Sequence, residues 1–484
     1  MIKEIAKHSL IYGIGNVLKN ASGFFLLPLY TSYLTVGEYG ELEIFIISIT
    51  VLVRILQLGF GSALFKYYSY DVEESTASSY RQNKILITSS FLFLVLFSLG
   101  CITGIALFRE SISQLLFQTQ EYANLVGVSL GIVFFQLLLI IPLSYLRIQN
   151  RSVLYSILNI AQFLVQVGLI IYFVAFLNWK INGVLTGRLV TTILFTLIFI
   201  WVIRNELVPR FSLGKIKEML EYGIYLVPVS ISSLVLMMSN RYFILFFRDA
   251  DEVGIFSVGN KIATILFLGV NAFQVAWPAF MFRIKEYENA KQIYSRVITY
   301  YVAVFVFIFL TIQLFSKELV LLLSNPDYLY AMIIIPILSL SYLIYGFFYV
   351  GTIGINIYKK TYFQTIAIVI GAVANFGINL WATPQFGIIG TAMTFLFSTT
   401  VVSALAVFFS QRIYRISFEW IRIFKILICA SGLIGVVYIF FPDMNLMNGV
   451  VKGSLLLIGF PFLLLIIGFL NKRERALIPL VNRF

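Results

Sequence analysis

Residues 35–66 read TVGEYGELEIFIISITVLVRILQLGFGSALFK, a short polar turn followed by a long apolar run with one arginine, Arg54, inside it. A helix needs about 20 mostly apolar residues to cross the hydrocarbon core of a bilayer. Similar runs recur along the whole chain, separated by short polar turns, and we count fourteen of them. Only 12% of the residues are charged, against roughly 25% in soluble domains. The sequence therefore predicts an all-α polytopic membrane protein with about fourteen transmembrane helices.

The loops between these runs alternate in charge along the chain. One set carries 25 of the 35 Lys and Arg residues, the opposite set carries five, and five lie inside the apolar runs. Because cytoplasmic loops are enriched in Lys and Arg, the pattern predicts an even number of spans with both termini in the cytoplasm. We call the end of the helices that bears the Lys/Arg-rich loops the basic end. These loops also account for the net charge of +13, so we expect no nucleic-acid partner.

The turn before the second span has a second copy later in the chain. TVGEYGELEIFIIS at residues 35–48 aligns with DADEVGIFSVGNKIA at residues 249–263, which places Gly40 over Gly254 at an offset of 214. Two shorter matches follow at offsets of 209 and 204, which predicts two six-span halves with a substrate site at their interface. The predicted domains are an N-terminal lobe of six spans at 1–210, a C-terminal lobe of six spans at 211–411 and a C-terminal helix pair at 412–484.

Five basic residues lie inside the apolar runs, and we expect no acidic residue at membrane depth to neutralise them. A charge at the bilayer centre costs roughly 2.5 to 3.5 kcal/mol, so these side chains must face something polar. The simplest such environment is a water-filled cavity that receives an anionic substrate. Four of the five lie on the repeat-related spans one, two, seven and eight, whereas the fifth lies near the outer end of span six. The five residues, in chain order, are Lys19, Arg54, Arg188, Arg241 and Lys261.

The candidate substrate-binding residues differ in how strongly the pattern supports them. Arg54 lies near the middle of its span, and a guanidinium fork suits bidentate phosphate binding, which makes it the strongest candidate. Asn20 and Gln57 are candidates for contacts with sugar hydroxyls, although amides in helix bundles more often bond to neighbouring helices. For the cations the alternative is snorkelling to an interface or pairing with a loop carboxylate, and for Arg188 snorkelling is the favoured interpretation.

The opening residues 10–43, LIYGIGNVLKNASGFFLLPLYTSYLTVGEYGELE, together with twelve spans in two lobes and a trailing pair, resemble the multidrug/oligosaccharidyl-lipid/polysaccharide exporter superfamily. Within it the chain looks most like the bacterial flippases for undecaprenyl-pyrophosphate-linked O-antigen, capsule or exopolysaccharide units. The resemblance implies alternating access in the bacterial inner membrane, through a cavity lined by spans one, two, seven and eight. It also implies contact with membrane lipids and with a polysaccharide polymerase complex.

Several other functions remain as alternatives or are disfavoured. A lipid II flippase of peptidoglycan synthesis and a drug or cation exporter of the same superfamily stay open, although buried cations argue against cationic drugs. A membrane polymerase or ligase would need a sizeable catalytic loop, which the short outer loops do not offer. The chain has no Gly-rich phosphate loop ending in Lys-Ser/Thr, so direct use of ATP is not expected. We accordingly expect no enzyme activity, cofactor or metal site.

Overall fold

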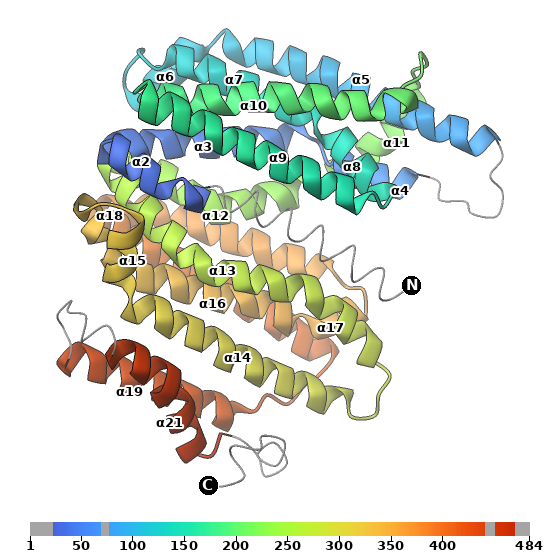
Figure 1. Ribbon diagram of the computed structural model, residues 1–484. Coiled ribbons are helices and arrows are strands. Elements are labelled where there is room, and N and C mark those ends of the chain that lie inside the picture. The colour runs from blue at the N-terminus through green and yellow to red at the C-terminus, as the bar shows by residue number, and fades with distance from the viewer. Residues whose placement is uncertain (1–22, 69–76, 441–450, 470–484) are drawn as a thin grey trace. The chain divides into compact units, whose positions relative to one another are not determined.

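The computed structural model describes residues 23–68, 77–440 and 451–469, and these form helices joined by short turns (Figure 1). The chain divides into two compact units, one made of Met1–Ser257 with Thr383–Gly387 and the other of Val258–Ala382 with Ile388–Phe484. The helices of the first unit are α2 (Leu27–Tyr33), α3 (Val36–Leu56), α4 (Phe60–Tyr67), α5 (Ala77–Ala106), α6 (Arg109–Phe117), α7 (Ala123–Leu138), α8 (Ile140–Ile148), α9 (Ser152–Ile171), η1 (Tyr172–Phe176), α10 (Lys180–Ile203), η2 (Arg204–Glu206), α11 (Leu213–Ile224) and α12 (Val227–Phe247).

Helix α13 (Ala250–Ile284) begins in the first unit and continues into the second. Helix α18 belongs mainly to the second unit and crosses the short segment assigned to the first. The helices of the second unit are α14 (Ala290–Leu314), α15 (Ser316–Leu323), η3 (Pro326–Ile333), α16 (Ile335–Gly351), α17 (Ile353–Ile357), α18 (Tyr362–Ile413), α19 (Trp420–Phe440), η4 (Leu455–Gly459) and α21 (Phe460–Ile466).

Eleven helices among the described residues are long and apolar enough to cross a membrane, and a shorter apolar helix covers Val451–Ile466. The 52-residue helix α18 contains two predicted spans, because Gly387 interrupts it with a backbone φ of 55° and ψ of −138°. Only glycine adopts such a conformation without strain, so the chain turns there. Most of the predicted first span lies outside the described residues. The predicted all-α polytopic fold is confirmed.

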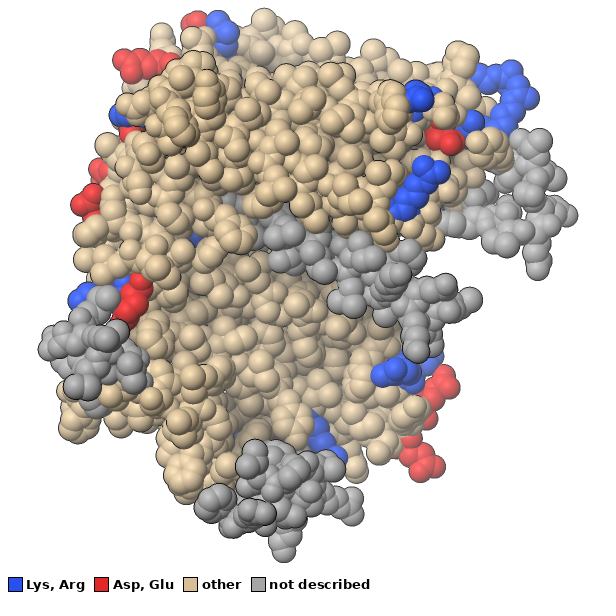
Figure 2. Space-filling model, viewed as in Figure 1, with Lys and Arg blue, Asp and Glu red and all other residues tan. Residues whose placement is uncertain are grey.

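Charged side chains gather at the ends of the helices in each unit. On the face shown in Figure 2, most of the charged side chains of each unit lie toward the ends of its helices, and the surface between these ends is largely uncharged. Within the first unit, α7 packs against α3, α5 and α10, and α3 also packs against α12. A helix with an apolar surface and charged ends is suited to cross a hydrocarbon layer, because all of its backbone hydrogen bonds are made within the helix.

The two copies of the repeat cross at their glycines. A Cβ atom on Gly40 of α3 would overlap the carbonyl oxygen of Ala250, and a Cβ atom on Gly254 of α13 would overlap the carbonyl oxygen of Val36. Val36 and Ala250, like Gly40 and Gly254, are related by the offset of 214 that aligns the two copies. The crossing is therefore symmetric at the level of the backbone, and it requires residues without side chains, as is common in membrane helix packing.

Candidate functional site

The second span breaks directly after Arg54 and Gln57. Helix α3 ends at Leu56, Leu58 has a φ of 49° and Gly59 a φ of 72°, and α4 then begins. The break packs against the end of α11, since a Cβ atom on Gly59 would lie 2.8 Å from the Cα atom of Gly223. Arg54 and Gln57 are three residues apart, which places them on one face of the helical turn just before the break.

The Arg54 side chain is exposed, and Gln57 is half-buried. Among the described residues the structure gives the Arg54 guanidinium neither a hydrogen bond nor an ion pair. An unpaired guanidinium in a membrane-spanning helix is expensive unless water or an anion meets it. No described residue therefore occupies the Arg54 guanidinium, which makes it the site candidate best placed to meet a ligand in the described part of the chain.

Arg241 is placed differently, inside the hairpin formed by α12 and α13. Its side chain is only 6% exposed, and its Nε donates a hydrogen bond of 3.0 Å to the hydroxyl of Ser257. The guanidinium also lies 5.7 Å from the ring centre of Phe256, within the range of a cation–π contact. In this conformation Arg241 ties two helices together and is not presented to a substrate.

The environment of Arg188 corrects the expectation that no acidic residue lies at membrane depth. Glu43 of α3 is only 4% exposed, and its Oε1 accepts a hydrogen bond of 3.3 Å from the hydroxyl of Tyr39. Glu43 and the half-buried Arg188 both lie close enough to the fully buried Tyr30 to interact with it electrostatically. The expectation was wrong because Glu43 stands at the polar edge of an apolar run, and only the tertiary packing buries it.

The burial of Glu43 places an opposite charge in the surroundings of Arg188, one of the five predicted cations. Arg188 and the buried carboxylate of Glu43 both lie near Tyr30, and the role of Arg188 in substrate binding stays a prediction. The Nε atom of Arg188 is buried and has no hydrogen-bond partner among the described residues. The sequence did contain a signal for Glu43, namely a carboxylate eight positions into α3 that precedes Arg54 on the same helix.

The structure brings two of the cation-bearing helices together. The hydroxyl groups of Ser48 in α3 and Tyr242 in α12 form a hydrogen bond of 2.7 Å, and the two helices pack along each other within the first unit. Lys261 is half-buried in α13 and lies in the second unit. Lys19 and Asn20 lie outside the described residues. The convergence of all four cavity cations thus stays a prediction.

The comparisons with known proteins agree with the architecture. A family model described as "Polysaccharide biosynthesis protein" matches residues 5–284. The chain belongs to this family. Among curated proteins, an uncharacterized membrane protein of Methanocaldococcus jannaschii is 24% identical over an alignment of 269 residues, and the match covers 52% of this chain and 52% of that protein. The chain thus matches about half the length of this curated relative.

Solved structures of transporters share the fold. The lipid II flippase MurJ in an inward closed conformation has a TM-score of 0.73 at 16% identity, over 93% of this chain and 98% of that chain. A mutant of the Vibrio cholerae MATE transporter VcmN has a TM-score of 0.60 at 16% identity, over 85% and 96%. A transporter of the MOP superfamily from Pyrococcus furiosus has a TM-score of 0.61 at 12% identity, over 85% of this chain and 95% of that chain. This protein therefore has the fold of transporters of the MOP superfamily.

Proposed function

We propose that this membrane protein is a flippase that moves an undecaprenyl-pyrophosphate-linked oligosaccharide from the cytoplasmic to the outer leaflet of the bacterial inner membrane. The oligosaccharide is a repeat unit for a cell-surface polysaccharide such as O-antigen or capsule, and transport proceeds by alternating access through a cationic central cavity. Membership of the polysaccharide biosynthesis family and the MOP transporter fold support this proposal. The distribution of basic loops supports both termini in the cytoplasm.

The observation that carries the proposal is Arg54 at the break in the second span, which is exposed and has no partner among the described residues. A pyrophosphate presents several oxygens in a geometry that a guanidinium binds through two parallel hydrogen bonds. Lys19 and Lys261 would add point charges to the same anion, and Asn20 and Gln57 would contact the sugar or the phosphate. Arg241 contributes only if the α12–α13 hairpin rearranges, because its guanidinium is engaged by Ser257 in this conformation.

The membrane potential supplies a driving force in the proposed direction. With a negative cytoplasm, moving one negative charge outward is favourable by about 2.3 kcal/mol per 100 mV. A doubly charged pyrophosphate gains roughly twice that amount, so this step needs no ATP. The expected partners are membrane lipids and a polysaccharide polymerase that consumes the flipped unit.

One observation favours a second candidate, a flippase for lipid II. The structural neighbour with the TM-score of 0.73 carries that name, and a lipid II headgroup presents the same pyrophosphate chemistry to Arg54. The MATE neighbours raise a third candidate, a drug or cation exporter, which the exposed positive charge of Arg54 argues against because it would repel a cationic drug. All three predict different effects on the pool of polyprenyl-linked lipids in the cell.

The test is mass spectrometry of polyprenyl-linked intermediates in a strain that lacks the protein, complemented with wild type, Arg54→Ala or Lys217→Ala. Lys217 is an exposed lysine of α11 outside the candidate spans and serves as the matched control. The proposal expects one pyrophosphoryl oligosaccharide to accumulate, and expects wild type and Lys217→Ala, but not Arg54→Ala, to clear it.

Accumulation of lipid II in place of that oligosaccharide would establish the second candidate. An unchanged lipid pool with new sensitivity to cationic drugs would overturn both flippase proposals. In vesicles containing the purified protein, a potential negative on the substrate side should accelerate flipping, and a reversed potential should slow it.

A further inference from the structure

A narrow apolar cavity of about 240 Å³ lies among α14, α16, α18 and α19, all within the second unit. Its walls include Ile298, Phe347 and Val407, and none of its described lining residues is charged. Ala404 and Trp420 line it as well, and both side chains are exposed, Trp420 to 67%. The cavity is therefore open to the surface of the second unit, near the basic loop that joins α18 to α19.

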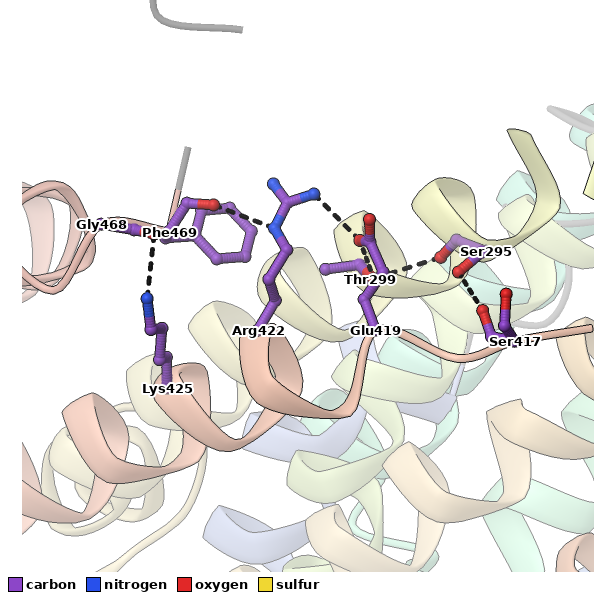
Figure 3. A network of polar contacts seen from close by, with 8 residues as sticks. All are labelled: Ser295, Thr299, Ser417, Glu419, Arg422, Lys425, Gly468 and Phe469. Carbon is purple, nitrogen blue, oxygen red and sulfur yellow. Dashed lines mark hydrogen bonds and ion pairs between the residues drawn. The ribbon is translucent and has the colours of Figure 1, made fainter. Parts of the chain in front are cut away.

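Polar contacts hold the start of α19 beside this cavity (Figure 3). Glu419 Oε2 accepts hydrogen bonds from the hydroxyl of Thr299 at 2.7 Å and from the Arg422 guanidinium at 2.9 Å. Arg422 Nε donates to the carbonyl oxygen of Phe469 at 2.9 Å, and Lys425 Nζ donates to that of Gly468 at 3.1 Å. These contacts join α19 to α14 and to the residues that follow α21, so the cavity has a preformed wall.

Two arginines lie in the chain between Val407 and Phe418, which both line the cavity, and neither has such partners among the described residues. Arg412 follows Ala404 and Phe408 at intervals of four residues, so the three side chains form one stripe along α18. The Arg412 guanidinium lies 4.4 Å from the Phe408 ring centre, and Arg415 follows just after the helix ends. Both arginines are exposed, and the structure gives neither an ion pair nor a hydrogen bond to a described residue.

We propose that this cavity binds one anionic phospholipid from the leaflet at the basic end, with an acyl chain between α18 and α19 and the phosphate between Arg412 and Arg415. Arg412 lies eight positions after Ala404 on α18, about 12 Å along the helix axis, which is close to half the thickness of a hydrocarbon core. Basic groups beside cavities between membrane helices bind anionic headgroups in this manner.

The size of the cavity selects this occupant over a polyprenyl chain. Its volume of about 240 Å³ is below the roughly 300 to 1,000 Å³ of sites that hold a whole drug-sized molecule. It accommodates part of one acyl chain, whereas a long branched polyprenyl chain would leave most of its length outside. The bound lipid would fill a void between α18 and α19 and so strengthen the attachment of the C-terminal helix pair.

The test measures lipid binding to the purified full-length protein by native mass spectrometry and by the shift in its melting temperature. The probes are phosphatidylglycerol, phosphatidylcholine and undecaprenyl phosphate, each added in detergent. The variants are Arg412→Gln with Arg415→Gln, and Ala404→Phe, which blocks the rim. The control is Arg210→Gln with Arg283→Gln, which removes two exposed arginines elsewhere on the basic loops.

The proposal expects wild type to retain phosphatidylglycerol in preference to phosphatidylcholine. The Arg412/Arg415 double variant should bind it on the order of 10- to 30-fold more weakly, because each arginine near an anionic surface contributes about 1 kcal/mol. Ala404→Phe should lose the same lipid, and the control should keep it. Equal binding of phosphatidylcholine, stronger binding of undecaprenyl phosphate, or equal weakening in the control would each overturn the proposal. The double variant changes only exposed side chains, so it decides the matter even where Ala404→Phe fails to fold.

Discussion

The two copies of the repeat share a backbone contact and differ in their charges. Gly40 and Gly254 make equivalent contacts in the crossing of α3 and α13. At the same offset of 214, however, Glu43 corresponds to Ser257, Arg54 to Leu268 and Lys261 to Ile47. Within α3 and α13, Glu38 and Glu252 are the charged pair that this offset preserves. The comparison teaches that the repeat preserves how the helices pack, whereas the charges farther along the two helices differ.

The largest expected effect comes from filling the symmetric crossing. Gly40→Ala and Gly254→Ala should each destabilise the protein by about 3 kcal/mol or more, because the new Cβ overlaps backbone atoms that no rotamer change can move. Chemical unfolding of the purified protein in detergent micelles measures the effect. The control is Gly104→Ala in α5, where a Cβ atom meets nothing within 4 Å, and this change should be neutral or stabilising. A large loss at only one of the two glycines would show that the crossing is not symmetric in energy.

The next effect separates the charges of the two copies by function. Arg54→Ala should lower the flipping rate roughly 10- to 100-fold, since charge-assisted hydrogen bonds contribute about 1.5 to 3 kcal/mol. The free energy of unfolding of this variant should differ from that of wild type by less than about 0.5 kcal/mol, because the Arg54 side chain is exposed and has no partner among the described residues. A fluorescent lipid-linked substrate in vesicles reports the rate. Arg54→Lys should recover part of it, and a melting temperature that falls in parallel with activity would contradict the assignment.

Arg241 should show the opposite pattern. Arg241→Met should destabilise the protein by about 1 to 3 kcal/mol, because it removes a buried hydrogen bond and leaves the Ser257 hydroxyl unsatisfied. Flipping per folded molecule should stay within about twofold of wild type if the residue acts only through stability. Ser257→Ala and the double variant complete a double-mutant cycle, and a coupling near zero would show that the hydrogen bond is not the source of the effect.

The smallest expected effect concerns Glu43 and Arg188. Glu43→Gln should destabilise the protein by about 1 to 2 kcal/mol, since it removes the buried carboxylate near a half-buried guanidinium. Adding Arg188→Gln should restore part of that loss, because the uncompensated charge is then gone. Unfolding in micelles measures both variants. Additive losses would indicate that the two residues do not compensate each other.

Much of the fold could be predicted from the sequence, and less of the candidate site. The second span was predicted at its place, and the break after Gln57 was missed because a leucine, Leu58, adopts a positive φ there beside Gly59. The arginines of α3 and α12 were correctly placed inside apolar helices. Their opposite surroundings were not predictable, since the partner of Arg241 is a serine on the next helix.

The sequence by itself determined the all-α polytopic fold, the alternation of basic loops and the positions of the repeated glycines. Hydrocarbon requires each span to satisfy its own backbone, so these features are local and can be read from consecutive residues. The tertiary structure alone decided that Glu43 is buried near Arg188, that Arg241 is engaged by Ser257, and that Arg54 is exposed. Those outcomes depend on contacts with side chains of other helices. The hydropathy of one span does not specify how the neighbouring helices align with it.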